Sequence, residues 1–89
     1  MITKIHLQNF RNYENETIQF QPGTNIFLGD NGQGKTNIIE SIYYLLTGKS
    51  YRVHREHELL RWNQSEFHLY GDFIIKHHKI SLESHYQDK

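Results

Sequence analysis

The sequence has no cysteine, no alanine and a single proline among its 89 residues. Without cysteine, the chain has no disulfide bonds, thiolate nucleophiles or thiolate metal sites. Charge of either sign is not in excess, because ten Lys and Arg balance ten Asp and Glu. A neutral chain has no long-range field that draws it to nucleic acid or membrane, so any site for a polyanion must be local.

Long hydrophobic runs are also missing. The longest apolar run, residues 42–46, has five residues, whereas a membrane-spanning helix needs about 20. The first residues lack the basic and apolar segments of a signal peptide. We therefore expect a cytoplasmic protein without a membrane partner. Apolar residues make up only 36% of the chain, which indicates one small core or a core that partner surface completes.

The first part of the chain has the pattern of a β-hairpin. Residues 3–10 alternate between apolar and polar side chains, as expected for a strand with one buried face. Residues 16–20 repeat the alternation, and residues 9–15 are predicted to be the turn between them.

A third strand and a helix are predicted next. Pro22 and Gly23 favour a turn, and the consecutive apolar residues 26–28 are typical of a strand covered on both faces. Residues 36–47 then change to a helical period that ends at Gly48. The apolar residues expected to form its one buried stripe are Ile38, Ile39, Ile42, Tyr43, Leu45 and Leu46.

The last part predicts a surface connection and a second hairpin. Residues 49–61 are rich in Lys, Arg and His, with a short helical turn expected around residues 57–61. Residues 67–75 and 80–86 alternate again on either side of a turn at residues 76–79. The predicted fold class is therefore α/β, with strands leading into a loop and helix and with an antiparallel β element.

The loop before the helix carries the strongest functional motif. Residues 29–36 read Gly-Asp-Asn-Gly-Gln-Gly-Lys-Thr and fit the P-loop pattern G-x-x-x-x-G-K-[ST] between a predicted strand and a predicted helix. Three glycines allow the loop to wrap around a phosphate chain with its N–H groups pointing inward. The helix start adds a positive dipole end. An ordinary glycine-rich turn is the less favoured alternative.

Two side chains of the motif have expected roles in ATP and Mg²⁺ binding. Lys35 is placed to reach the β- and γ-phosphates and is the candidate catalytic residue, and the Thr36 hydroxyl is placed to ligate Mg²⁺. The motif residues predicted to bind nucleotide are Gly29, Asp30, Asn31, Gly32, Gln33, Gly34, Lys35 and Thr36.

A second Mg²⁺-binding carboxylate, which a P-loop hydrolase needs at the end of a buried strand, is not evident. The nearest candidate is Asp72, but it interrupts an alternating strand instead of following an apolar one. We expect this chain to bind nucleotide better than it hydrolyses it, so its status as an enzyme stays open.

The flanks of the motif resemble a known family. Residues 7–13 (LQNFRNY) and residues 37–43 (NIIESIY) are similar to the opening of the RecF DNA repair ATPases, relatives of the SMC and ABC-type heads. Residues 48–52 (GKSYR) and 58–62 (ELLRW) resemble the segment that follows the helix in that family. The resemblance extends the predicted nucleotide site to Asn37 and Arg11.

The resemblance implies that residues 1–89 are the N-terminal segment of an ABC/SMC-like ATPase head. The Walker B carboxylates, the signature motif and the helical arm of the family are absent from the sequence. In a full-length RecF-like protein, ATP would switch homodimer formation on DNA during recombinational repair and replication restart. Two alternatives stay open, namely a stand-alone nucleotide-binding or kinase-like domain and an inactive structural fragment.

Two weaker signals concern DNA and metal. Residues 49–62 contain several basic and aromatic side chains that could contact DNA, although glutamates dilute them and a solvated surface is favoured. Seven histidines suggest metal binding, and His54 with His57 and His77 with His78 are the closest pairs. Neither pair has a carboxylate or thiolate at a usual ligand spacing, so no metal site other than that for Mg²⁺ is expected.

Overall fold

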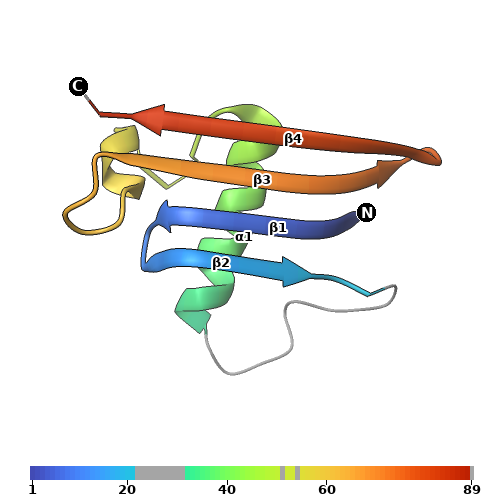
Figure 1. The fold of residues 1–89 in the computed structure, drawn as a ribbon, viewed down its shortest axis with the longest axis horizontal. Helices are drawn as coiled ribbons and strands as arrows, with labels where there is room; N and C mark the ends of the chain where they lie inside the picture. The colour runs from blue at the N-terminus through green and yellow to red at the C-terminus, as the bar shows by residue number, and fades with distance from the viewer. Residues whose placement is uncertain (22–31, 51, 54, 89) are drawn as a thin grey trace.

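The computed structural model describes residues 1–21, 32–50, 52–53 and 55–88, and residues 32–35 by their backbone alone. A four-stranded antiparallel sheet in the order β2-β1-β3-β4 has helix α1 against one face (Figure 1). No helix among the described residues is long and apolar enough to cross a membrane. The elements are β1 (Ile2–Phe10), β2 (Tyr13–Gln19), α1 (Gly32–Thr47), the 3₁₀ helix η1 (Glu56–Leu59), β3 (Glu66–Ile75) and β4 (His78–Gln87).

Both predicted hairpins are confirmed, and their turns are shorter than the sequence indicated. The β1–β2 turn occupies residues 11–12 instead of 9–15, because Gln8 pairs with Asn15 and Phe10 with Tyr13. The polar residues of β2 lie on an exposed edge strand, which leaves no apolar alternation to mark its start. The predicted turn at residues 76–79 is likewise reduced to residues 76–77.

The core lies between the sheet and α1. Ile5 and Leu7 of β1 and Leu69 of β3 are buried on the face that α1 covers. Phe67 lies at the centre of an aromatic cluster, with its ring centroid 5.3 Å from Phe10, 5.5 Å from Tyr44 and 5.4 Å from Tyr86. The alternating residues of the same strands form a polar outer face.

The helix begins earlier than predicted. Helical backbone starts at Gly32, so residues 32–35 belong to α1 and not to the loop before it. Glycine disfavours the interior of a helix through its backbone entropy, which is why the sequence pattern placed the start at Thr36. The predicted turn at Pro22 and Gly23 and the predicted strand at residues 26–28 lie outside the described residues.

The predicted buried stripe of the helix is wrong in part. Tyr43 and Leu46 are 42% and 54% exposed, whereas the polar residues Asn37, Glu40 and Ser41 are buried. Apolar residues occur nearly all around α1, so their spacing alone does not identify the side that faces the sheet. The face of α1 that is buried includes Asn37 and Glu40, which form hydrogen bonds with residues from other segments of the chain.

The predicted end of the helix and the predicted short helical turn are both present. Gly48 has a φ of +78° and donates its backbone N–H to the carbonyl of Tyr44 over 2.7 Å, as expected for a glycine that ends a helix. The expected turn around residues 57–61 is η1, which is shifted toward the N-terminus and buries Leu59 against the core.

Gly71→Ala should destabilise the fold by about 1 kcal/mol, the low end for overpacking, because the side-chain ends of Leu45 on α1 and Phe73 on β3 must shift to admit a methyl group. A Cβ at Gly71 would lie 2.9 Å from Cδ1 of Leu45 and 2.9 Å from Cε1 of Phe73. Urea unfolding of both proteins measures the difference. Leu45→Val removes one of the clashing atoms, so its loss and that of Gly71→Ala should be less than additive. Full additivity would contradict this contact.

Candidate functional site

The described part of the P-loop motif lies at the N-terminus of α1. Residues 29–31 fall outside the described residues, and residues 32–36 are the first five residues of the helix. The first turn has no acidic residue and includes Lys35. Backbone N–H groups at a helix start have no partner within the helix and carry the positive end of the dipole, so this end favours an anion.

Asn37 connects the start of α1 to the β1–β2 turn. Its buried side chain donates from Nδ2 to Oδ1 of Asn12 over 3.0 Å and accepts at Oδ1 from Nη1 of Arg52 over 3.0 Å. The sequence predicted Asn37 as a nucleotide-binding residue. In the structure the Asn37 amide links the start of α1 to the β1–β2 turn and to the segment that follows the helix. Its contact with nucleotide stays a prediction.

Glu40 is the fully buried acidic group of this site. Its carboxylate accepts two parallel hydrogen bonds from Arg11, from Nε over 2.8 Å and from Nη2 over 2.9 Å. The Ser50 hydroxyl donates over 2.9 Å, and Nη1 of Arg52 lies 3.3 Å away. The sequence motifs did not predict a role for Glu40, although Glu40 lies one helical turn after Asn37 and so shares its face of α1. Arg11, predicted to contact nucleotide, is thus held by Glu40.

The electrostatic balance keeps Glu40 ionised. Burial acts to raise its pKa, but hydrogen bonds from Arg11 and Ser50 and the charges of Arg11 and Arg52 outweigh burial. The net result is a pKa below the ordinary value of 4.5. The buried carboxylate therefore carries a negative charge near neutral pH and can hold both guanidinium groups in place.

The lowered pKa predicts a pH dependence of stability. A carboxyl group whose pKa is lower in the folded than in the unfolded state contributes stability that is present above its unfolded pKa and is lost as the pH falls. The free energy of unfolding of the wild type relative to Glu40→Gln should therefore be largest above pH 4.5 and should shrink below it. Urea unfolding at several pH values measures this; a pH-independent difference would contradict the ion pair.

Side-chain hydrogen bonds also hold the segment after α1 against the helix. The Tyr44 hydroxyl donates to Oε2 of Glu56 over 2.9 Å, and burial, with the adjacent Glu56, raises the pKa of Tyr44. The Ser50 hydroxyl accepts from the backbone N–H of Arg52 over 3.0 Å. Arg52 is one of the basic residues within residues 49–62, the segment considered above for DNA contact. Its guanidinium instead contacts Asn37 and Glu40, which supports a structural role for this side chain.

The β1–β2 turn is held against residues 59–61. The backbone N–H of Arg11 donates to the carbonyl of Leu59 over 2.7 Å, and that of Arg61 donates to the carbonyl of Asn9 over 2.9 Å. Asn9 and Arg11 have φ values of 56° and 54°, which non-glycine residues rarely adopt. These contacts bring together segments that are about 50 residues apart in the sequence.

A hollow of about 610 Å³ opens between these segments, beside the start of α1. Its lining includes Arg11 and Asn37 together with Arg61 and the 84% exposed Trp62. The full lining comprises Arg11, Asn12, Asn37, Glu58, Leu60, Arg61 and Trp62. Beside the one carboxylate of Glu58, the hollow offers two cationic groups, two amides and an aromatic ring, which suit a ligand with anionic and planar parts.

Asp72 lies on the other face of the sheet. Its neighbours Gly71 and Phe73 are buried toward α1, so the alternation of β3 directs Asp72 outward. Its Oδ1 accepts a hydrogen bond from the Ser81 hydroxyl over 2.7 Å, and its Oδ2 lies 3.7 Å from Nζ of Lys4. The sheet therefore separates Asp72 from Thr36, and it is not a second ligand for Mg²⁺ at the start of α1.

Comparison with known proteins shows similarity over almost the whole chain. A family model described as AAA domain matches residues 4–88. The DNA replication and repair protein RecF of Desulfitobacterium hafniense is 67% identical over 85 residues, which cover 96% of this chain and 23% of that protein. RecF of Limosilactobacillus reuteri is 40% identical over 89 residues, covering 100% of this chain and 24% of that protein.

Solved structures give the same result. The structure of the recombination mediator protein RecF-ATPrS in the RecFOR pathway superposes with a TM-score of 0.80 at 26% sequence identity. The match covers 98% of this chain and 24% of that one, and RecF-ATP matches with a TM-score of 0.79. The chain therefore spans about a quarter of the length of these relatives. The similarities support the expected resemblance and give the kinase-like alternative no support.

Proposed function

Because the chain belongs to the AAA domain family and is related to RecF proteins over nearly all its length, we propose that it binds ATP with Mg²⁺ at the start of α1. The observation that carries the proposal is the position of the motif. Lys35 and Thr36 lie in the first turn of a helix that has no acidic residue there, next to a hollow lined by two arginines.

In this proposal, different residues of the motif bind different parts of Mg-ATP. N–H groups of residues 29–35 bind phosphate oxygens, and the ammonium group of Lys35 neutralises the β- and γ-phosphates. The fit to Mg²⁺ depends on Thr36, because it places a hydroxyl oxygen, a ligand type that Mg²⁺ accepts, at this end of α1. When bound, Mg²⁺ neutralises phosphate charge. The chain's own residues hold and orient the nucleotide.

The hollow beside α1 is the proposed site for the rest of the nucleotide. Trp62 offers an exposed ring that can stack on a base, and Arg61 and Arg11 offer guanidinium groups for stacking or phosphate contact. Glu40 acts indirectly in this proposal, since it fixes the guanidinium of Arg11 at the edge of the hollow. Asn37 acts in the same way by fixing the β1–β2 turn.

The function of a longer RecF-like protein extends this proposal. There, residues 1–89 would be the N-terminal segment of the ATPase head, and ATP would control homodimer formation on DNA. The supporting observation is that the relatives are named as DNA replication and repair proteins and as a recombination mediator. A role in bacterial DNA replication and repair agrees with the cytoplasm, which is the compartment that we propose for this function.

The thermal midpoint of the chain with and without Mg-ATP tests the proposal. At a ligand concentration ten times the Kd, binding to the folded state adds about 1.4 kcal/mol, or about 6–11 °C for a domain of this size. Lys35→Ala should abolish the rise. Lys49→Ala, which changes an exposed lysine beyond the other end of α1, should keep it. An unchanged midpoint in the wild type would overturn the proposal and favour an inactive fragment.

A further inference from the structure

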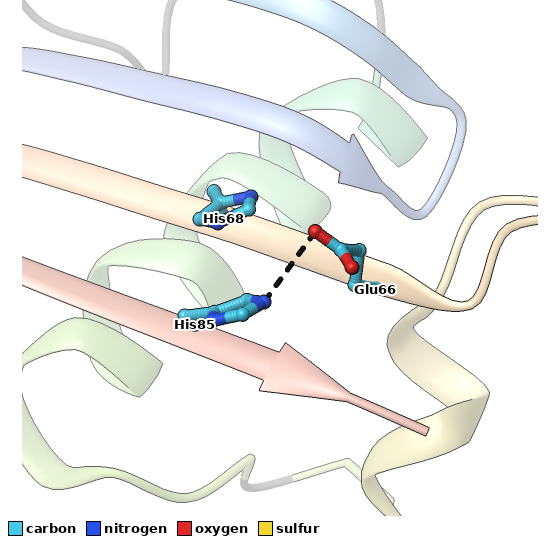
Figure 2. Close-up of side chains that lie close together, drawn as sticks. All are labelled: Glu66, His68 and His85. Carbon is cyan, nitrogen blue, oxygen red and sulfur yellow. Dashed lines mark ion pairs between the residues drawn. The ribbon is translucent and has the colours of Figure 1, made fainter. Parts of the chain in front are cut away.

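Three metal-ligating side chains meet on the outer face of the sheet, away from α1 and the proposed nucleotide site. Figure 2 shows Glu66 and His68 on β3 and His85 on β4, with α1 behind the sheet. One ligand atom from each of the three residues lies within 4.8 Å of the others. The spacing of histidines in the sequence does not reveal this cluster, because only the pairing of β3 with β4 brings His68 and His85 together.

The backbone register creates the cluster. His68 and His85 are directly paired across β3 and β4, and Glu66 shares their face because it lies two residues before His68. The two imidazole rings stack with centroids 4.1 Å apart and an interplanar angle of 7°. Nε2 of His85 lies 3.5 Å from Oε1 of Glu66 (Figure 2).

The chemistry of the three groups matches a borderline divalent cation. Zn²⁺ binds imidazole nitrogen and carboxylate oxygen at about 2.0–2.2 Å, and two His with one Glu is a known ligand set for it. Ligand atoms around a tetrahedral Zn²⁺ are then about 3.4 Å apart. The distance from His85 to Glu66 is close to this value, and the ligand atom of His68 lies within 4.8 Å of both, so His68 has to rotate to complete the set.

We propose that Glu66, His68 and His85 form a Zn²⁺ site that bridges β3 and β4 and leaves one coordination position open to solvent. Two of the ligands are on one strand and the third is on its neighbour, so the bound ion links the two strands of the C-terminal hairpin.

Calorimetric titration of the 89-residue chain with ZnCl₂, without nucleotide, tests this site. We expect one Zn²⁺ per chain and a thermal midpoint that rises with Zn²⁺ concentration. Loss of a residue that only supports a ligand already weakens metal binding by about 10–100-fold. His68→Gln, His85→Gln and Glu66→Gln should therefore each weaken Zn²⁺ binding by at least about 100-fold. Each replaces a surface side chain, so folding should persist.

The control is His78→Gln, which removes an exposed histidine of the same hairpin outside the cluster. It should leave the Zn²⁺ affinity unchanged. Absence of binding to the wild type, or an unchanged affinity in any one of the three cluster variants, would overturn the site. Loss of binding in His78→Gln would also overturn it, because the ion would then be held at the turn. None of these outcomes affects the ATP proposal, which concerns the other face of the sheet.

Discussion

Glu40→Ala should lower the free energy of unfolding by about 3 kcal/mol, because it leaves Arg11 and Arg52 without their carboxylate. Removal of one partner from a fully buried ion pair costs about 3–5 kcal/mol. The lower end applies here, since the side chains of Arg11 and Arg52 keep 20% and 28% of their surface exposed and can partly rehydrate. Chemical unfolding monitored by circular dichroism measures the loss.

A double-mutant cycle separates the ion pair from the effect of simple truncation. If Arg11 and Glu40 act as a pair, the losses in Arg11→Ala and Glu40→Ala should not add in the double variant. Glu14→Ala, which truncates an exposed glutamate on the edge strand β2, is the control and should change stability by less than about 0.5 kcal/mol. Additive losses would show that Glu40 is not held by Arg11.

Phe67→Ala should destabilise the chain by about 3–5 kcal/mol, the range for a large aromatic side chain removed from a core. Phe67 is fully buried and contacts an aromatic ring from each of three other elements, namely Phe10 on β1, Tyr44 on α1 and Tyr86 on β4. Its loss removes contacts between the sheet and the helix together. Thermal and urea unfolding are the measurements.

The burial of the Phe67 side chain, and not its location on β3, should determine this loss of stability. Ile75→Ala truncates an exposed apolar residue at the end of the same strand and should cost less than about 1 kcal/mol. Phe67→Leu keeps most of the buried volume and should fall between the two. A similar loss for Ile75→Ala and Phe67→Ala would contradict the location of the core.

Patterns within a short stretch of sequence predicted the elements well. Strict alternation identified both hairpins, and Gly48 marked the end of the helix. The tight turn at residues 76–77 was not visible, because both Lys76 and His77 have positive φ values where Asn or Gly would be the usual signature. Local composition therefore identifies strands better than it identifies the turns between them.

Features created by pairing between distant segments were not predictable. Glu40 is buried because Arg11 and Ser50, 29 and 10 residues away, supply its hydrogen bonds. The spacing of residues in the helix carries no information on such partners, so the polar side of α1 was missed. The cluster of Glu66, His68 and His85 depends in the same way on the register of β3 and β4.

The ³¹P NMR spectrum of Mg-ATP titrated with the chain tests the central claim most directly. If the start of α1 binds the phosphates, the β- and γ-phosphate resonances should shift or broaden with wild-type protein and with Lys49→Ala, and should not change with Lys35→Ala. Phosphate resonances that are unaffected by the wild type, or that change equally with Lys35→Ala, would contradict the assignment of this helix end as a nucleotide site.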